Sequence, residues 1–361
     1  MLDIKLKFGG NHSEARDWMA TSPLRQLFWN VTYACNYRCP ICFTDSGAPS
    51  PGELAFAEAE AMLLQAKAAG VRDIIISGGE PFMRADLPDL LARMAELGLT
   101  ARIASNGSLV TDALLDRLRR ETRVKSFQIS LDTLDAALYQ KLHGSAPRSL
   151  ERALAALDAI KAHGFHTTVS VRLTPETLPG IPAMLDAARR NGWSTVTIHC
   201  PLHTRRADGA FAQDDDVLTT LHPALEHFCE IDGAWLIETY IPWAPWHPAM
   251  RQLEKRFRVV HRGCRAGRDR LTVNPTGSVS PCVCLDVPPA HIGNVRQDDL
   301  SALFRDAPLC QIFRHPAEHG ICDDCAHVAA CGGGCRASAY ALTGHLDGPD
   351  GSCPVRQARG S

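Results

Sequence analysis

Four glycines divide the first half of the chain into a repeated unit. Gly70, Gly98, Gly164 and Gly192 each follow a helical pattern rich in Ala and Leu and precede an apolar run typical of a strand. Helices commonly end on a residue in the left-handed conformation, which glycine adopts without steric penalty. The helical patterns cover residues 54–69, 87–97, 111–121, 149–163 and 182–191, and the strand patterns cover residues 27–32, 71–77, 100–105, 124–131, 165–173 and 194–199.

This alternation constrains the fold more than any other feature of the sequence. Strands and helices in strict alternation predict a parallel α/β sheet with right-handed crossovers. Six strands can form a partial barrel or an open, doubly wound sheet. In both architectures the functional residues lie at the C-terminal ends of the strands.

Three cysteines follow the first predicted strand as Cys35-x3-Cys39-x2-Cys42. Three thiolates can hold three irons of a [4Fe–4S] cluster and leave the fourth iron open to a non-protein ligand. An open coordination position is what separates catalytic metal sites from structural ones. A structural zinc knuckle with a distant fourth ligand is the alternative, since zinc sites also use closely spaced cysteines.

Polar residues also follow the other predicted strands. Each of these groups alone could form a turn or a helix cap. Because such groups follow several successive strands, they predict one shared ligand site at the C-terminal edge of the sheet. The groups are Gly78-Gly79-Glu80-Pro81, Ser105-Asn106-Gly107, Ser130-Leu131-Asp132, Arg172 and His199.

Nine of the fourteen cysteines lie between Cys264 and Cys353. Because the chain shows no export signal, this clustering favours metal sites over disulfides. Residues 271–273 and 278–283, around Pro275-Thr276-Gly277, predict a hairpin that holds the first of these cysteines together. Seven to nine cysteines suffice for two four-iron clusters or for up to two zinc ions.

Length and charge exclude several classes of protein. The chain has 361 residues and a formal net charge of −2, so it carries no excess charge for nucleic acid or a membrane surface. No apolar run approaches the ~18 residues of a membrane span, and the N-terminus lacks a signal-peptide core. We expect a cytoplasmic protein with an N-terminal extension (1–26), a barrel (27–210), a connecting segment (211–260) and a cysteine-rich domain (261–361).

Together, the Cys-x3-Cys-x2-Cys, Gly-Gly-Glu-Pro, Ser-Asn and Ser-Leu-Asp motifs resemble the radical S-adenosylmethionine (SAM) enzymes. The C-terminal cysteine array resembles their SPASM extension, which binds two auxiliary [4Fe–4S] clusters. Residues 331–344 are most similar to the subgroup that includes pyrroloquinoline quinone and mycofactocin peptide maturases and haem-pathway enzymes. The resemblance implies a partial (β/α)6 barrel followed by a small SPASM domain.

The resemblance also assigns roles to individual residues. Cys35, Cys39 and Cys42 would hold the cluster that binds SAM. The SAM molecule would contact Ile41, Gly78, Gly79, Glu80, Pro81, Ser105, Asn106, Ser130, Asp132 and Arg172. The outer auxiliary cluster would be held by Cys322, Cys325, Cys331 and Cys353, and the inner one by Cys264, Cys282 and Cys335, with Cys284 as the expected fourth ligand. Cys310 matches no ligand position.

The reaction implied by this resemblance starts with reductive cleavage of SAM to a 5′-deoxyadenosyl radical, which abstracts a hydrogen atom. The auxiliary clusters could accept an electron from the substrate radical, which favours net oxidation by cross-linking, dehydrogenation or decarboxylation. A flavodoxin or ferredoxin would supply the first electron. Sulfatase maturases carry a general base directly after the equivalent of Cys282, but Val283 stands here and Asp286 is the nearest carboxylate.

Two substrate classes stay open. Residues 1–26 are too few for the leader-binding domain of many peptide maturases, so a precursor peptide would need a separate recognition protein. The alternative is a small molecule, such as a tetrapyrrole side chain or a sugar or nucleoside intermediate. A zinc-stapled binding protein is the non-catalytic alternative.

The connecting segment is expected to be specific to this enzyme. Residues 236–248 predict a strand that enters an aromatic and proline-rich loop with Trp243 and Trp246, which either walls the substrate cavity or seals the junction between domains. Residues 214–216 predict the start of a helix. On position alone, the candidates for proton transfer are His199, His203, Glu238 and Tyr240.

Overall fold

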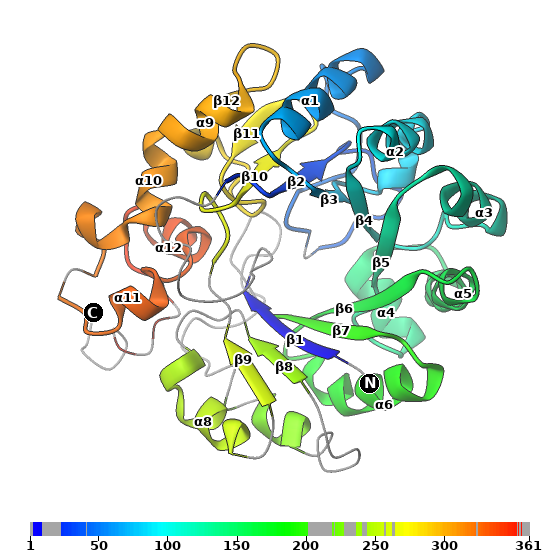
Figure 1. Ribbon diagram of the computed structural model, residues 1–361. Helices are drawn as coiled ribbons and strands as arrows, with labels where there is room; N and C mark the ends of the chain where they lie inside the picture. Colours follow the sequence, from blue (N-terminus) through cyan, green and yellow to red (C-terminus); the bar gives the residue numbers. More distant parts are fainter. Residues whose placement is uncertain are drawn as a thin grey trace.

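In the part of the chain that the structure describes, twelve strands form one continuous sheet that curves into an open ring (Figure 1). The computed structural model describes residues 3–8, 23–40, 42–200, 219, 221–226, 236–239, 244–255, 258–261, 264–322, 324–351, 353 and 355. The strand order is β12-β11-β10-β2-β3-β4-β5-β6-β7-β1-β8-β9. Since β12 and β9 stand at the two edges, the described strands make an unclosed barrel.

The six predicted strands form the centre of this sheet, and each pairs in parallel with the next. They are β2 (Gln26–Asn30), β3 (Asp73–Ser77), β4 (Thr100–Ser105), β5 (Val124–Ser130), β6 (His166–Arg172) and β7 (Thr195–Cys200). The five predicted helices are also confirmed, as α1 (Phe56–Ala68), α2 (Leu87–Glu96), α3 (Asp112–Glu121), α5 (Ser149–Ala162) and α6 (Ile181–Asn191). All four dividing glycines have a positive φ, from 65° at Gly192 to 92° at Gly70.

The main hydrophobic core lies between the outer face of the sheet and these helices. Leu27 and Trp29 of β2 and Ile74 and Ile76 of β3 are fully buried there. Alternate strand residues point to opposite faces, so every second side chain packs against the helices. The remaining residues of each strand face the interior of the barrel, where Phe28, Ile75 and Val283 form a separate apolar cluster.

One flank of the sheet contains a strand that the sequence did not predict. Residues Asp3–Phe8 form β1, which lies parallel between β7 and β8 (Leu236–Thr239). Its apolar residues alternate with lysines, a period of two that fits a strand. β8 confirms the strand expected in the connecting segment, and β9 (Arg258–His261) follows it at the edge.

The other flank belongs to the cysteine-rich part of the chain. The predicted hairpin is present as β10 (Arg270–Val273) and β11 (Ser278–Ser280), and β10 pairs in parallel with β2. The short β12 (Gly293–Asn294) completes this flank. The helices that follow are α9 (Leu300–Asp306), α10 (Pro308–Arg314), α11 (Val328–Cys331) and α12 (Arg336–Thr343), which lie beside this edge of the ring (Figure 1).

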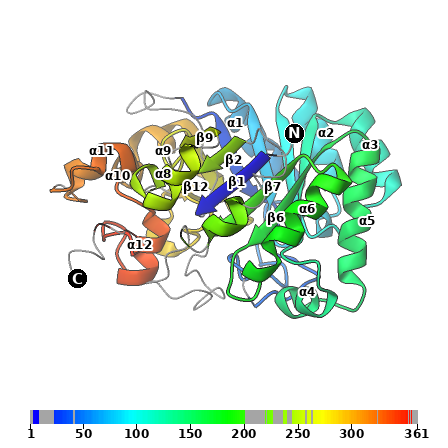
Figure 2. The same cartoon turned by 90° about the horizontal axis from the view of Figure 1, so that it is seen from below.

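A short helix at one end of the sheet was also missed. Helix α4 (Ala136–His143) lies apart from the outer helical layer (Figure 2). The Asp135 carboxylate caps its first turn by accepting from Leu138 N at 2.7 Å, and Gly144 ends it at φ 50°. The remaining short elements are α8 (Pro248–Glu254) and the 3₁₀ turns η1 (Pro81–Met83), η2 (Leu178–Gly180), η4 (Ala244–Trp246), η5 (Pro288–Ala290) and η6 (Pro316–His319).

A transmembrane helix needs a long apolar stretch, and none of the helices in the described part of the chain has one.

Candidate functional site

The loop after β2 brings Cys35, Cys39 and Cys42 into one compact turn. Cys35 N–H donates to Gly47 O at 2.9 Å, and Cys42 N–H donates to Cys39 O at 3.3 Å. Burial raises the pKa of Cys35 to about 12, and the neighbouring Glu80, Cys39 and Cys42 add to this rise. Cysteine binds a metal as the thiolate, so the metal replaces the proton of the thiol. Three thiols in one turn fit an iron–sulfur group.

The turn after β3 packs directly on this cysteine loop. Gly79 N–H donates to Thr32 O and Glu80 N–H donates to Ala34 O, both at 2.8 Å. A Cβ atom on Gly79 would lie 2.1 Å from Ala34 O, and Gly78 has φ 131°. Both positions therefore require glycine so that two backbone segments can meet. Pro81 then begins η1 and is buried.

The carboxylate of Glu80 is fully buried at this junction. It accepts hydrogen bonds from Ser105 Oγ and Asn106 N, both at 2.8 Å, and from Phe82 N at 3.4 Å. Burial raises its pKa to about 7, and the three hydrogen bonds oppose this rise. No basic side chain among the described residues forms an ion pair with it, so the carboxylate fits a ligand that brings a further N–H donor.

The end of β4 is tied to the cysteine loop as well. Asn106 Nδ2 donates to Asn36 Oδ1 at 2.9 Å, and Asn36 Nδ2 donates to Ser108 Oγ at 2.8 Å. The predicted ligand contacts Ser105 and Asn106 thus meet Glu80 on one side and the cysteine loop on the other. Ser130, at the end of β5, is half-buried.

Asp132 and Arg172, both expected to contact SAM, form an ion pair beside Cys39. Asp132 is 2% exposed and has φ 52°, an uncommon conformation for a residue with a side chain. Its carboxylate accepts from Arg172 N at 2.6 Å and from the Arg172 guanidinium at 2.5 Å. Although burial favours protonation, Arg172 and His143 hold the pKa of Asp132 well below its usual range.

His143, the last residue of α4, was not predicted as part of the site. Its Nε2 atom lies 3.0 Å from Asp132 Oδ2, and its Nδ1 atom lies 3.8 Å from Cys39 Sγ. Burial alone would raise the pKa of Cys39, but the contact with His143 and the charge of Arg172 outweigh it and lower this pKa. Only tertiary structure reveals this contact, because 104 positions separate the two residues.

The structure places two other predicted site residues, His199 and Glu238, on strands β7 and β8. His199 is half-buried at the end of β7 and lies opposite Arg172 in the strand register. Glu238 belongs to β8, opposite Lys5, but its side chain is outside the described part. Ile41, His203, residues 214–216, Tyr240 and Trp243 are outside the described residues.

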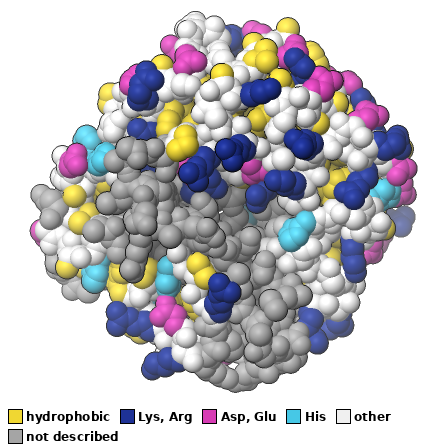
Figure 3. Space-filling view, in the orientation of Figure 1, with side chains coloured by type: hydrophobic (Ala, Val, Ile, Leu, Met, Phe, Trp, Pro, Cys, Tyr) yellow, Lys and Arg dark blue, Asp and Glu magenta, His cyan; other side chains and the backbone are white. Residues whose placement is uncertain are grey.

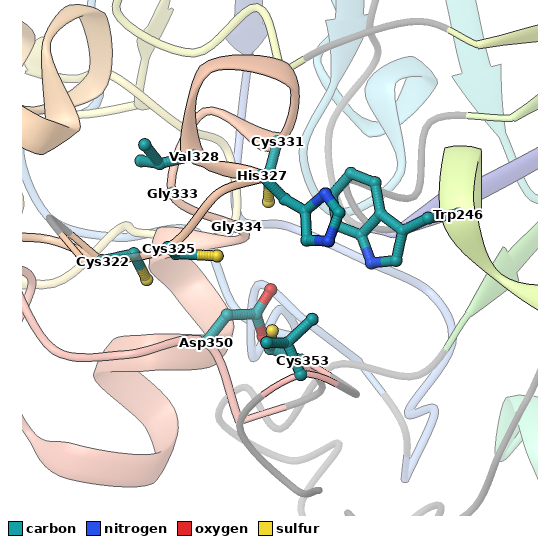
Figure 4. Close-up of a pocket in the computed structure, with 11 residues that line it drawn as sticks. Trp246, Cys322, Cys325, His327, Val328, Cys331, Gly333, Gly334, Asp350 and Cys353 are labelled. Carbon is teal, nitrogen blue, oxygen red and sulfur yellow. The ribbon is translucent and has the colours of Figure 1, made fainter. Parts of the chain in front are cut away.

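Four of the C-terminal cysteines surround one small cavity (Figure 4). They are the four predicted ligands of the outer cluster, Cys322, Cys325, Cys331 and Cys353. Burial raises the pKa of Cys331 to about 12, and Asp350, Cys353 and Cys322 add to this rise. The structure therefore brings together the four thiols that the resemblance assigns to one cluster.

Trp246 and His327 border the same cavity. Their rings stack with centroids 4.4 Å apart and planes at 14° (Figure 4). This contact joins η4 of the connecting segment to the cysteine-rich part. Trp246 was expected either at the substrate cavity or at the domain junction, and here it packs against the outer cysteine site.

The predicted inner ligands form a second group. Cys264, Cys284 and Cys335 pack against the apolar cluster that contains the buried Cys282. The pKa of Cys282 is raised well above its usual value, mainly by a hydrogen bond with Cys284 and then by burial. The pKa of Cys335 is also raised well above its usual value, mainly by burial and further by Asp350 and the thiols of Cys282 and Cys264. All four thiols are therefore neighbours.

Two charged residues near these cysteines escaped the sequence analysis. Asp350 is buried and accepts from Cys335 N at 2.7 Å, while it also lines the outer cavity. Arg268 donates from Nε to Phe313 O at 2.7 Å and lies against Gly332, beside Cys331. Neither residue belongs to a recognisable motif.

Two further residues, Cys310 and Asp286, have surroundings typical of a structural role. Cys310, which matched no ligand position, is fully buried in the main hydrophobic core. Asp286 is the carboxylate nearest to Cys282 along the chain. It accepts hydrogen bonds from the Tyr33 hydroxyl and from Asn274 Nδ2, the latter at 2.8 Å, and it lies 2.9 Å from His291 Nε2.

Within the part of the chain described here, no three or more Cys, His, Asp or Glu side chains lie close enough together to hold a single metal ion.

Comparison with known proteins identifies both parts of the chain. The model of the radical SAM superfamily matches residues 29–188, and that of the iron–sulfur cluster-binding SPASM domain matches residues 264–326. A mycofactocin maturase, MftC of Mycobacterium ulcerans, is 30% identical over 340 residues, which cover 91% of this chain and 87% of the maturase.

Two further comparisons agree. An AdoMet-dependent heme synthase of Oleidesulfovibrio alaskensis is 29% identical over 356 residues, covering 93% of this chain and 89% of the synthase. The fold matches the crystal structure of Streptococcus suis SuiB bound to S-adenosylmethionine, with a TM-score of 0.71 and 20% identity over 92% of this chain and 77% of SuiB.

Radical SAM enzymes bind SAM and a [4Fe–4S] cluster, and SPASM domains bind auxiliary iron–sulfur clusters, in agreement with the three groups of thiols described above. The partial barrel, the cysteine-rich extension and these relatives together show that the chain is an enzyme of the radical SAM superfamily with a C-terminal SPASM domain.

Proposed function

We propose that this enzyme removes a hydrogen atom from a ribosomal precursor peptide and leaves the peptide oxidised by a cross-link, a dehydrogenation or a decarboxylation. The observation that carries the radical chemistry is the buried Glu80 carboxylate beside the Cys35–Cys42 loop. When bound, the cluster supplies the electron that cleaves SAM to methionine and a 5′-deoxyadenosyl radical.

The residues of the chain position the reactants. Cys35, Cys39 and Cys42 hold the cluster, and Glu80 accepts a hydrogen bond from the amino group of SAM. Ser105 and Asn106 fix the Glu80 carboxylate, so that it needs no rearrangement when SAM arrives. The two glycines of the Gly78-Gly79 turn keep this carboxylate against the cysteine loop.

The SPASM cysteines provide the sites for net oxidation. Cys322, Cys325, Cys331 and Cys353 hold the outer cluster, while Cys264, Cys282, Cys284 and Cys335 hold the inner one. Bound to these thiols, the clusters would supply acceptors for the electron that the substrate gives up when it is oxidised. A flavodoxin or ferredoxin is the expected reductant for the SAM-binding cluster.

The similarity to mycofactocin maturase supports a peptide substrate, since maturases of this subgroup act on precursor peptides. The similarity to AdoMet-dependent heme synthase, of nearly the same extent, supports a second candidate, the side chain of a tetrapyrrole. Several Lys and Arg side chains lie close together near the middle of one face of the molecule, and others lie along its outline among Asp and Glu side chains (Figure 3). A local group of basic side chains attracts substrates with carboxylates, which both candidates can carry.

Substrate oxidation by the reconstituted enzyme tests the proposal. Short precursor peptides encoded beside the gene, and separately a tetrapyrrole with propionate side chains, would be incubated anaerobically with enzyme, SAM and dithionite. We expect 5′-deoxyadenosine in amounts matching an oxidised peptide, seen as a mass loss of 2 Da per bond formed or as the loss of a carboxyl group. A Cys35→Ala variant is the matched negative control.

The result also separates the two candidates. Oxidised tetrapyrrole with unchanged peptides would replace the first candidate by the second. Absence of 5′-deoxyadenosine from a preparation with all its iron would contradict the radical chemistry itself.

A further inference from the structure

A buried chain of side chains runs from Arg172 through Asp132 and His143 to Cys39. The Arg172 guanidinium reaches Asp132 Oδ2 at 2.5 Å, Asp132 Oδ2 lies 3.0 Å from His143 Nε2, and His143 Nδ1 lies 3.8 Å from Cys39 Sγ. The His143 and Asp132 side chains are each 1% exposed. Water therefore does not take the place of either partner.

The ring of His143 is held in place from several directions. It stacks on Tyr139 with centroids 4.1 Å apart, and the edge of Tyr37 lies 6.1 Å away. Its backbone carbonyl accepts from Arg38 N at 3.2 Å. Gly144 packs so closely on Arg38 that a Cβ atom there would lie 2.3 Å from Arg38 O. The end of α4 is thus fastened to the cysteine loop.

The chemistry of the two partners defines what the ring does. A cysteine that binds iron is a thiolate, whose sulfur accepts hydrogen bonds but has none to donate. The Asp132 carboxylate on the opposite side of the ring is likewise an acceptor. Nε2 lies within ion-pair distance of Asp132 but forms no hydrogen bond with it, whereas Nδ1 is in hydrogen-bond contact with Cys39 Sγ. Because a thiolate can only accept, Nδ1 faces Cys39 as the donor.

The backbone of Asp132 is constrained as well as its side chain. Its φ is 52°, and such strained conformations persist where the surrounding structure imposes them. The carboxylate lies between Arg172 and His143. Arg172 also donates its backbone N–H to Asp132 Oδ1 at 2.6 Å. The carboxylate is therefore fixed from β6, and it in turn fixes the ring of His143.

We propose that His143 is a positioning residue that donates a hydrogen bond to the Cys39 sulfur and raises the reduction potential of the SAM-binding cluster, with Asp132 and Arg172 holding its ring. Hydrogen bonds to ligand sulfurs withdraw electron density and stabilise the reduced cluster, which carries one more electron. This inference rests on the proposed role of Cys39 as a cluster ligand.

Two variants of the full-length, reconstituted enzyme test it. His143→Leu removes the donor and preserves most of the volume, whereas His143→Asn keeps an amide N–H close to the position of Nδ1. Midpoint potentials would be measured by electron paramagnetic resonance during a redox titration, following only the signal that changes when SAM is added. We expect a lower potential in His143→Leu and a potential close to that of the wild type in His143→Asn.

A second measurement does not depend on the folding of the leucine variant. In wild-type enzyme labelled with ¹⁵N-histidine, we expect a hyperfine coupling between an imidazole nitrogen and the reduced SAM-binding cluster, and its loss in His143→Asn. An unchanged potential in a His143→Leu enzyme with full iron content, or no coupling in the wild type, would overturn the role of His143. If no signal responds to SAM in the wild type, the assignment of the cysteine loop fails instead.

Discussion

The backbone N–H of Asn106 donates to Glu80 Oε2 across 2.8 Å and so joins the ends of β3 and β4. The carboxylate is consequently buried and oriented before any ligand arrives. A buried carboxylate without a basic partner in the described structure costs stability, and this cost is expected where the chain prepares a binding site.

The raised pKa of Glu80 predicts a pH dependence of stability. The folded-state pKa is about 7 and the usual value is 4.5, so between these values the native protein binds more protons than the unfolded chain. The stability contributed by this group is therefore complete at low pH and is lost as pH rises toward and through 7. The full effect is on the order of 3 kcal/mol.

Thermal unfolding of SAM-free enzyme, compared with Glu80→Gln between pH 5 and 8, measures this effect. Glutamine can accept from Asn106 and donate to Ser105 without titrating. The wild type should lose stability relative to the variant as pH rises, and a constant difference would contradict the assigned burial.

Glu80→Gln should also weaken SAM binding. A charge-assisted hydrogen bond contributes about 1.5–3 kcal/mol, which corresponds to a loss of roughly 10- to 100-fold in affinity. Equilibrium binding of SAM to the reconstituted variant would show this, with the iron content unchanged. Equal affinities would exclude Glu80 from contact with SAM.

Replacing Cys35, Cys39 and Cys42 together by Ala should abolish formation of 5′-deoxyadenosine while leaving iron in the protein. Three four-iron clusters hold ~12 irons, and the variant should retain ~8. Cys310→Ala is the matched control, because this cysteine lies in the hydrophobic core and should keep all irons and full activity. Undiminished SAM cleavage by the triple variant would refute the cluster assignment.

The outer SPASM site predicts a complementary result. Cys322→Ala/Cys325→Ala removes two of the four thiols around the cavity, so that iron should fall from ~12 to ~8 per chain. Cleavage of SAM with dithionite should persist, since the cysteine loop after β2 is intact. Iron analysis and product chromatography on the same preparation suffice, and retention of all irons would show that these thiols do not bind the outer cluster.

Gly79→Ala should disrupt the junction between the two loops. The new methyl group would lie 2.1 Å from Ala34 O, a backbone atom that cannot rotate away. Overpacking of this kind costs about 1–3 kcal/mol or more, and the cysteine loop should lose iron. Gly180→Ala provides the control, because nothing lies within 4 Å of that position. Equal thermal stabilities of the two variants would contradict the close packing.

The central part of the fold could be predicted because its signals are local. Four of the five helices lie within one short stretch together with the glycine that follows them, and Gly70 and Gly192 do adopt the left-handed conformation that the pattern requires. The outer cysteine group was expected from the resemblance to SPASM domains, which assigns four cysteines to it. All four, including the distant Cys322 and Cys353, line one cavity.

What the sequence could not reveal depends on distant partners. Residues 3–8 alternate correctly for a strand, but their pairing partners in β7 and β8 lie 192 and 233 positions away along the chain. The short α4 carried too weak a periodic signal to identify. His143 consequently showed no sign of its contact with Cys39, which exists only because α4 folds back onto the cysteine loop.

The parallel pairing of β10 with β2, in which Leu271 lies opposite Leu27, has a consequence for engineering. The loop of Cys35 continues β2, and Cys282 follows the hairpin that begins with β10. The spacing between these redox loops is therefore set by strand register and is independent of the length of the connecting segment. A chimera that exchanged SPASM domains between enzymes would have to preserve this register, because a slip of one residue moves one loop by about 3.3 Å and turns every side chain of the slipped strand to the opposite face.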